Sequence, residues 1–121
     1  MQMIEKDGIL IAHSNAAYVH ELRLFLEANG HSVYSGIDDA FVALGFILKY
    51  QPGLALLEHE FHYLSARDVI AAIGRKEIST KVIQIFPENF GGSLPNSNYI
   101  HIDDPFEKIT SCINSLINTF Q

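Results

Sequence analysis

The chain has 121 residues, of which 48% are hydrophobic and 18% are charged, as expected for one compact domain spanning residues 1–121. Its formal net charge is −6 and its eight lysine and arginine residues are scattered, which argues against binding to nucleic acid or to an anionic membrane. Because the chain has no apolar signal segment, no apolar stretch near the roughly 20 residues that span a bilayer and a single cysteine, Cys112, we expect a cytoplasmic protein without disulfides.

Short apolar runs alternate along the chain with segments of helical periodicity, which is typical of a parallel sheet built from strand–helix–strand units. The predicted elements of the first half are a strand at 8–12, a helix after Asn15 that ends at Asn29-Gly30, a strand at 32–35 and a helix at 40–50. Apolar residues recur at the spacing of one inward helix face. These are Tyr18, Leu22, Phe25 and Leu26 in the first helix, and Phe41, Leu44, Ile47 and Leu48 in the second.

The second half continues the alternation with one interruption. Its predicted elements are a strand at 54–57, a helix at 65–74, a strand at 81–86, a loop at 87–98, a strand at 99–102 and a last helix from Phe106. Ser65 and Asp68 have the spacing of a capping box, and Val69, Ile70 and Ile73 are expected to face inward. The 87–98 segment contains Gly91-Gly92-Ser93-Leu94-Pro95, which has neither the length nor the propensity for a full helix.

These elements predict an α/β, flavodoxin-like (βα)5 fold, a doubly wound parallel sheet of strand order 2-1-3-4-5 whose fourth helix is shortened or absent. In such sheets the functional crevice lies at the carboxyl ends of the strands, near the switch point between strands one and three. The residues expected around this crevice are His13, Ser14, Glu58, His59, Phe86 and Asp104.

Over nearly its whole length, the chain resembles the receiver domain of two-component response regulators. Ile9-Leu10-Ile11-Ala12 followed by His13-Ser14-Asn15 matches the strand that ends in the acidic pair of that family. The segment from Leu26 to Val33 matches the end of the first helix and the second strand. Leu54-Ala55-Leu56-Leu57-Glu58 matches the third strand with its phosphorylation site, and Asp104-Pro105-Phe106 matches the family's Lys-Pro-Phe.

The resemblance implies a pocket in which each chemical part of a receiver is altered. A receiver needs carboxylates for Mg²⁺, an aspartate acceptor, and a hydroxyl and a lysine for the phosphoryl oxygens, because phosphoryl transfer depends on positioning and charge neutralisation. Here His13-Ser14 replaces the acidic pair, Glu58 replaces the acceptor, Phe86 replaces the threonine or serine and Asp104 replaces the lysine. We therefore expect no cofactor, with Mg²⁺ binding weak or absent.

Each substitution has a physical consequence. The extra methylene of Glu58 displaces its carboxylate by roughly an ångström, which matters for in-line attack. Phe86 cannot donate a hydrogen bond to a phosphoryl group, and Asp104 adds negative charge where the family has a cation. His101 occupies the position of the family's switch aromatic residue, and the short 87–98 segment alters the usual output surface.

Two residues have competing interpretations. Glu58 is either a mimic of a phosphorylated aspartate or a substitution without a signalling role. Asp104, with Pro105 and Glu107, has the spacing of a helix N-cap with proline at the first helical position, whereas the resemblance implies a cis peptide bond before Pro105.

The sequence thus predicts a non-enzymatic, non-phosphorylatable receiver-like domain that binds a protein partner in two-component-type signalling, and it leaves a homodimer open. One alternative is an atypical receiver phosphorylated at Glu58 or elsewhere. Another is a metal-binding flavodoxin-like domain in which His13, Glu58, His59 and His62 hold a transition metal such as Zn²⁺.

Overall fold

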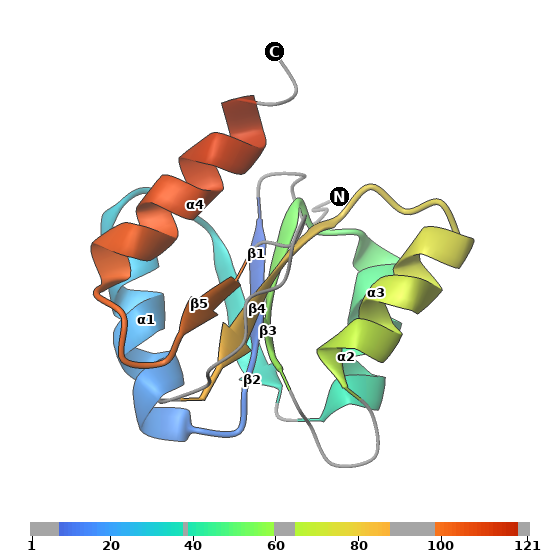
Figure 1. Ribbon diagram of the computed structural model, residues 1–121, viewed down its shortest axis with the longest axis horizontal. Helices are drawn as coiled ribbons and strands as arrows, with labels where there is room; N and C mark the ends of the chain where they lie inside the picture. Colours follow the sequence, from blue (N-terminus) through green and yellow to red (C-terminus); the bar gives the residue numbers. More distant parts are fainter. Residues whose placement is uncertain (1–7, 38, 60–64, 88–98, 119–121) are drawn as a thin grey trace.

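The computed structural model describes residues 8–37, 39–59, 65–87 and 99–118, which form one parallel sheet with helices on both faces (Figure 1). The strand order is β2-β1-β3-β4-β5, which confirms the predicted flavodoxin-like fold and its order. The elements, in chain order, are β1 (Ile9–Ala12), α1 (Ala16–Ala28), β2 (Val33–Ile37), α2 (Ala40–Tyr50), β3 (Leu54–Glu58), α3 (Ala66–Arg75), β4 (Lys81–Phe86), β5 (Tyr99–His101) and α4 (Phe106–Asn118).

The element boundaries follow local signals closely. β4 has the predicted bounds, and the side chains of Asn15, Asp39 and Ser65 cap the N-termini of α1, α2 and α3. Ser65 and Asp68 form the predicted capping box. β2 runs two residues beyond its predicted end, and the prediction of a shortened or absent fourth helix falls in residues 88–98, outside the described part of the chain.

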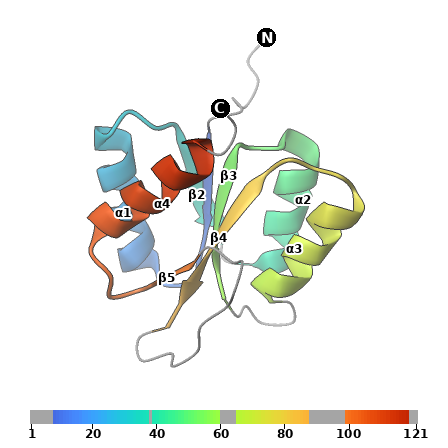
Figure 2. The same ribbon diagram turned by 45° about the horizontal axis from the view of Figure 1, so that its top comes forward.

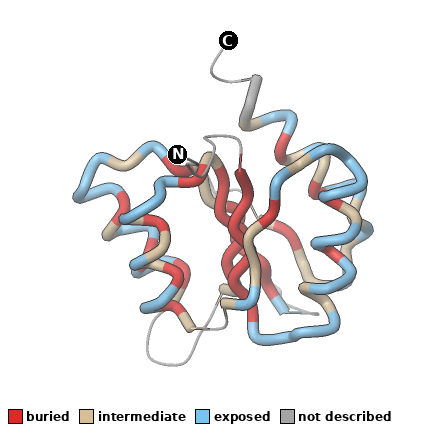
Figure 3. Tube along the Cα trace, turned by 180° about the vertical axis from the view of Figure 1, so that it is seen from behind, coloured by how far each residue is buried: buried red, intermediate tan, exposed pale blue. Residues whose placement is uncertain are grey.

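Figure 2 shows α1 and α4 on one face of the sheet and α2 and α3 on the other. Two hydrophobic clusters, one on each face, hold these layers together. Alternate residues of the strands point to opposite faces, so Ile9 and Ile11 pack under α1 and α4, while Leu10 and Ala12 pack under α2 and α3. All four of these β1 residues are buried, and the inner strands appear as a continuous buried band in Figure 3. Burial on both faces explains why the strands are solid apolar runs in the sequence.

The predicted inward faces are confirmed for α1 and only in part for α2 and α3. Leu22 and Leu26 of α1 are buried, as are Ile47 of α2 and Val69 and Ile73 of α3. Phe41 of α2, however, is 58% exposed, and Ile70 of α3 is 37% exposed. Besides Ile47, α2 rests on Ala40 and Ala43. Because α2 is apolar around most of its circumference, spacing alone could not identify its inward face.

One irregularity lies on the edge strand β2. The pairing register between β1 and β2 shifts between Leu10 and Ala12, and Gly36 on β2 has a φ of +89°. A bulge on an edge strand disrupts the flat template on which another strand could pair. Among the helices of the described ranges, none is long and apolar enough to span a membrane.

Candidate functional site

The predicted crevice residues lie at the carboxyl edge of the sheet, where β1 and β3 are adjacent. His13 and Ser14 follow β1, and Glu58 is the last residue of β3. The chain leaves β1 through α1 on one face and reaches β3 from α2 on the other, so this edge is a topological switch point. The sequence therefore placed these residues at the correct edge of the sheet.

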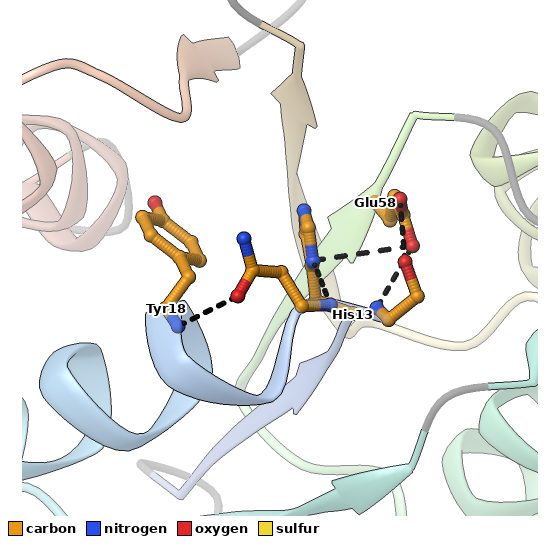
Figure 4. Close-up of polar contacts among 5 residues, drawn as sticks. His13, Tyr18 and Glu58 are labelled. Carbon is orange, nitrogen blue, oxygen red and sulfur yellow. Dashed lines mark hydrogen bonds and ion pairs between the residues drawn. The ribbon is translucent and has the colours of Figure 1, made fainter.

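Ser14 holds the Glu58 carboxylate through two hydrogen bonds (Figure 4). The Ser14 backbone N–H donates to Oε1 at 2.9 Å, and the Ser14 hydroxyl donates to Oε2 at 3.0 Å. Both oxygens of the carboxylate are thus engaged by one residue from the loop after β1. This contact fixes the β1–α1 loop against the end of β3.

His13 is neutral in this arrangement. Its Nδ1 accepts a hydrogen bond from the Asn15 backbone N–H at 3.0 Å, so this nitrogen carries no proton. The same Nδ1 lies 4.0 Å from Glu58 Oε1, which is a contact with an anion but not an ion pair. Burial of the ring lowers the pKa of His13 below its usual value, and the nearby Glu58 only partly offsets that effect.

Tyr18 of α1 lies beside His13, with its ring centroid 5.3 Å from the imidazole (Figure 4). Its hydroxyl is buried and has no hydrogen-bond partner within the described ranges. Burial, together with the charge of Asp104, raises the pKa of Tyr18 to about 12. The phenol therefore stays protonated beside the site.

Phe86, at the end of β4, fills the centre of an aromatic cluster rather than facing an open pocket. It is fully buried, and its ring centroid lies 4.1 Å from that of His59 and 5.4 Å from that of Tyr99. His101 lies at the margin of this cluster, 6.2 Å from Phe86. His59 Nδ1 also lies 3.1 Å from the buried Gln84 Oε1, within hydrogen-bond distance.

Asp104 is bound within its own loop and does not cap α4. Its Oδ2 accepts a hydrogen bond from the His101 backbone N–H at 2.7 Å and lies 3.1 Å from Lys108 Nζ. Partial burial opposes ionisation, but the His101 N–H and Lys108 together hold the pKa of Asp104 below its usual value. The Asp104–Pro105 bond is trans, so the cis bond implied by the resemblance is not found, and α4 begins only at Phe106.

Lys108 is a site residue that the sequence reasoning missed. It lies one helical turn after Asp104 and partly neutralises that carboxylate. The i, i+4 spacing of Asp104 and Lys108 was the signal that could have identified the pair.

The expected metal ligands do not form a cluster in the described ranges. No group of three histidine, cysteine, aspartate or glutamate residues there lies close enough to hold a metal ion. His13 and Glu58 approach each other, but His59 is directed to Gln84, and His62 lies outside the described residues.

An open pocket of about 300 Å³ adjoins the site between α1 and β2. Its lining includes His13 and Ser14, together with Ala16, Val19, His20, Arg23, Ser35 and Gly36. Two of these lining residues are joined by a 2.9 Å hydrogen bond from the Arg23 guanidinium to the Ser35 hydroxyl. Glu58 is not among the residues that line this pocket.

No protein-family model matches the sequence, and a search of curated proteins finds no relative. The solved structures do show similar folds. A response regulator receiver protein from Sinorhizobium medicae aligns with a TM-score of 0.81 and 13% identity, over 97% of this chain and 98% of that one. A CheY-like receiver domain protein from Methanospirillum hungatei aligns with a TM-score of 0.80 and 18% identity, over 95% and 96% of the two chains.

The signal receiver domain of the response regulator NarL from Mycobacterium tuberculosis aligns with a TM-score of 0.76 and 20% identity, over 93% of this chain and 96% of that one. At these identities the similarity concerns the fold. The chain has the fold of response regulator receiver domains, and its strand order agrees with this match.

Proposed function

We propose that this chain is a receiver-like signalling domain that binds a protein partner without being phosphorylated. The observation that carries the proposal is the Glu58 carboxylate at the end of β3, held by the backbone N–H and the hydroxyl of Ser14. In a receiver, this position would hold the phosphoacceptor. A carboxylate whose two oxygens already accept hydrogen bonds gives the loop a fixed arrangement without a phosphoryl group.

The surroundings of Glu58 support a loss of phosphotransfer. Mg²⁺ favours hard oxygen ligands, whereas β1 is followed by a buried, neutral His13 and a Ser14 hydroxyl already bonded to Glu58. Phe86 supplies a buried ring and no donor to a phosphoryl oxygen. Asp104 is an anion whose nearest cation, Lys108, is held at 3.1 Å. A phosphoryl dianion in this crevice would meet carboxylates rather than a free cation.

This interpretation makes the chain a binding module of two-component-type signalling rather than an enzyme, with a protein partner. Glu58 then acts as a permanent anion at the end of β3, with about one charge where a phosphoryl group carries nearly two. We expect the partner to recognise the carboxyl edge of the sheet in this one arrangement.

The test is phosphoryl uptake from a small donor. The purified protein is incubated with acetyl phosphate and Mg²⁺ beside a phosphorylatable receiver, and the intact masses are recorded. We expect no phosphoryl-sized mass increase in this protein under conditions that modify the control receiver. Titration with millimolar Mg²⁺, followed by amide NMR, should likewise produce no saturable shift at Ser14 or His59.

The opposite outcome identifies the alternative function. A mass increase that disappears in Glu58→Gln and persists in Glu21→Gln, an exposed glutamate on α1, would show that Glu58 is an acceptor and would overturn the proposal. An increase that persists in both variants would place the acceptor at another residue and would overturn it equally.

A further inference from the structure

Helix α2 presents an apolar surface that no part of the described residues covers. Phe41 is 58% exposed and Val42 is 57% exposed, and Gly45 is exposed one turn further along the same side. We call these three residues the α2 surface. Lys49 is the only charged residue within the helix. The three residues of the α2 surface carry no polar side-chain group that water could hydrate.

The described part of the chain gives no reason for a glycine at position 45. The φ of Gly45 is not in the left-handed region, and a Cβ built on it would meet no atom of the described residues within 4 Å. Glycine in the middle of an exposed helix is unfavourable compared with alanine, because it has more conformational freedom to lose. A glycine in that place is useful when another backbone or a large side chain approaches the helix closely.

The α2 surface is complementary to itself. Phe41 is a large projecting ring, and Gly45 leaves a gap one helical turn away on the same face. When two copies of α2 cross in antiparallel directions about a two-fold axis, the Phe41 ring of each lies over the Gly45 gap of the other. A symmetric dimer requires such a projection and gap on one surface.

The charges at the two ends of α2 favour the same arrangement. Asp39 caps the N-terminus, and Lys49 lies in the last turn. Antiparallel copies bring the Lys49 end of each helix to the Asp39 end of its partner, whereas parallel copies bring like charges together. The helix dipoles are also opposed favourably in the antiparallel pair.

We propose that the α2 surface is a homodimer interface, in which α2 of one copy packs antiparallel against α2 of a second copy. The interface does not involve the Glu58 site, so this proposal can be tested independently of the proposed function. An interface centred on one helix of 11 residues is at the small end for protein pairs. We therefore expect a weak dimer, with a dissociation constant on the order of tens of micromolar.

Sedimentation velocity over a wide range of protein concentration tests the proposal on the whole chain. The wild-type protein should change from monomer to dimer as its concentration rises. Phe41→Gln removes the projecting ring and Gly45→Gln fills the gap, so each should weaken the dimer at least about tenfold. Both sites are exposed in the monomer, and circular dichroism should show folded variants, with Gly45→Gln at least as heat-stable as the wild type.

Leu24→Gln is the matched control, because Leu24 is a 52% exposed apolar residue on α1, on the opposite face of the sheet. It should leave the dimer unchanged. Lys49→Gln should weaken the dimer at low salt and have little effect at high salt, where screening already removes the charge contribution.

Three results would overturn the proposal. One is a monomer at every concentration, which would show that the α2 surface does not bind a second copy of this chain. Another is a dimer that Phe41→Gln and Gly45→Gln leave intact. The last is a dimer that Leu24→Gln disrupts as strongly as the α2 variants, since the interface would then lie elsewhere or the effect would be non-specific.

Discussion

Hydrogen-bond direction determines the chemistry of the site at the scale of single residues. His13 Nδ1 accepts from the Asn15 N–H, and both Glu58 oxygens accept from Ser14. The imidazole is therefore neutral beside a carboxylate that is already satisfied. The buried His13 and the occupied Glu58 carboxylate are the basis of the proposal that this site does not transfer phosphoryl groups.

The buried state of His13 predicts a pH dependence of stability. Burial lowers the pKa of His13 in the folded protein, although Glu58 acts in the opposite direction. In the unfolded chain the pKa of a histidine is about 6.5. Between the folded pKa and about 6.5, the unfolded chain therefore binds more protons than the folded protein. The contribution of His13 to the free energy of unfolding should be fully present above about pH 6.5. It should be lost as the pH falls from there towards the folded pKa. Urea unfolding from pH 7.5 to 5 measures the effect.

His13→Asn keeps an acceptor near the Asn15 N–H and removes the titrating group. Its free energy of unfolding should therefore decrease less than that of the wild type over the same pH range. His20→Asn, at an exposed histidine on α1, serves as the control and should follow the wild type. Parallel pH curves for the wild type and His13→Asn would show that burial of His13 does not affect its protonation.

At the scale of secondary-structure elements, glycine acts in two different ways. Gly36 occupies the left-handed region at the β2 bulge, where a side chain is strained by roughly 1–2 kcal/mol. Gly45 occupies ordinary helical backbone, and no atom of the described residues lies within 4 Å of a Cβ built on it. One glycine is thus needed by the fold of the monomer, and the other is not.

A matched pair of substitutions separates these roles. Gly45→Ala should raise the free energy of unfolding of the monomer by about 1 kcal/mol, because alanine is the better helix former and its Cβ meets no atom of the described ranges. Gly36→Ala should lower it by about 1–2 kcal/mol. Thermal and urea unfolding at low protein concentration, where any dimer is dissociated, measures both. A destabilising Gly45→Ala would reveal a constraint on α2 that the monomer structure does not show.

At the scale of the whole molecule, the sheet joins two cores into one cooperative unit. Leu56 and Leu57 are neighbours on β3, both are fully buried, and they point into the clusters on opposite faces. Because β3 is paired with β1 and β4, loss of packing on either face weakens the same central strand. We expect the two faces to unfold together.

Leu56→Ala and Leu57→Ala test this coupling. Each should lower the free energy of unfolding by about 2–5 kcal/mol and retain a single transition that circular dichroism and tyrosine fluorescence report at the same urea concentration. Two separated transitions in either variant would show that the α1/α4 side and the α2/α3 side unfold independently.

The type and order of the elements were determined by the sequence alone, because they depend on local periodicity, caps and turn residues. Buried apolar runs predicted the strands. The starts of three helices follow Asn15, Asp39 and Ser65, whose side chains accept hydrogen bonds from backbone N–H groups of the first turn. The strand order followed from alternation and from the handedness of the connections. His13, Ser14 and Glu58 were placed at one edge because the carboxyl ends of parallel strands lie together.

The contacts of the side chains were decided only by the tertiary structure. The Ser14–Glu58 hydrogen bonds join residues 44 positions apart, and no local pattern specifies which oxygen accepts from which donor. The contact between His59 and Gln84 joins residues 25 positions apart, and Asp104, which was considered a helix cap, binds the His101 N–H and Lys108. Phe41 was expected to face inward and is exposed, because the packing of smaller residues against the sheet sets the rotation of an almost wholly apolar helix.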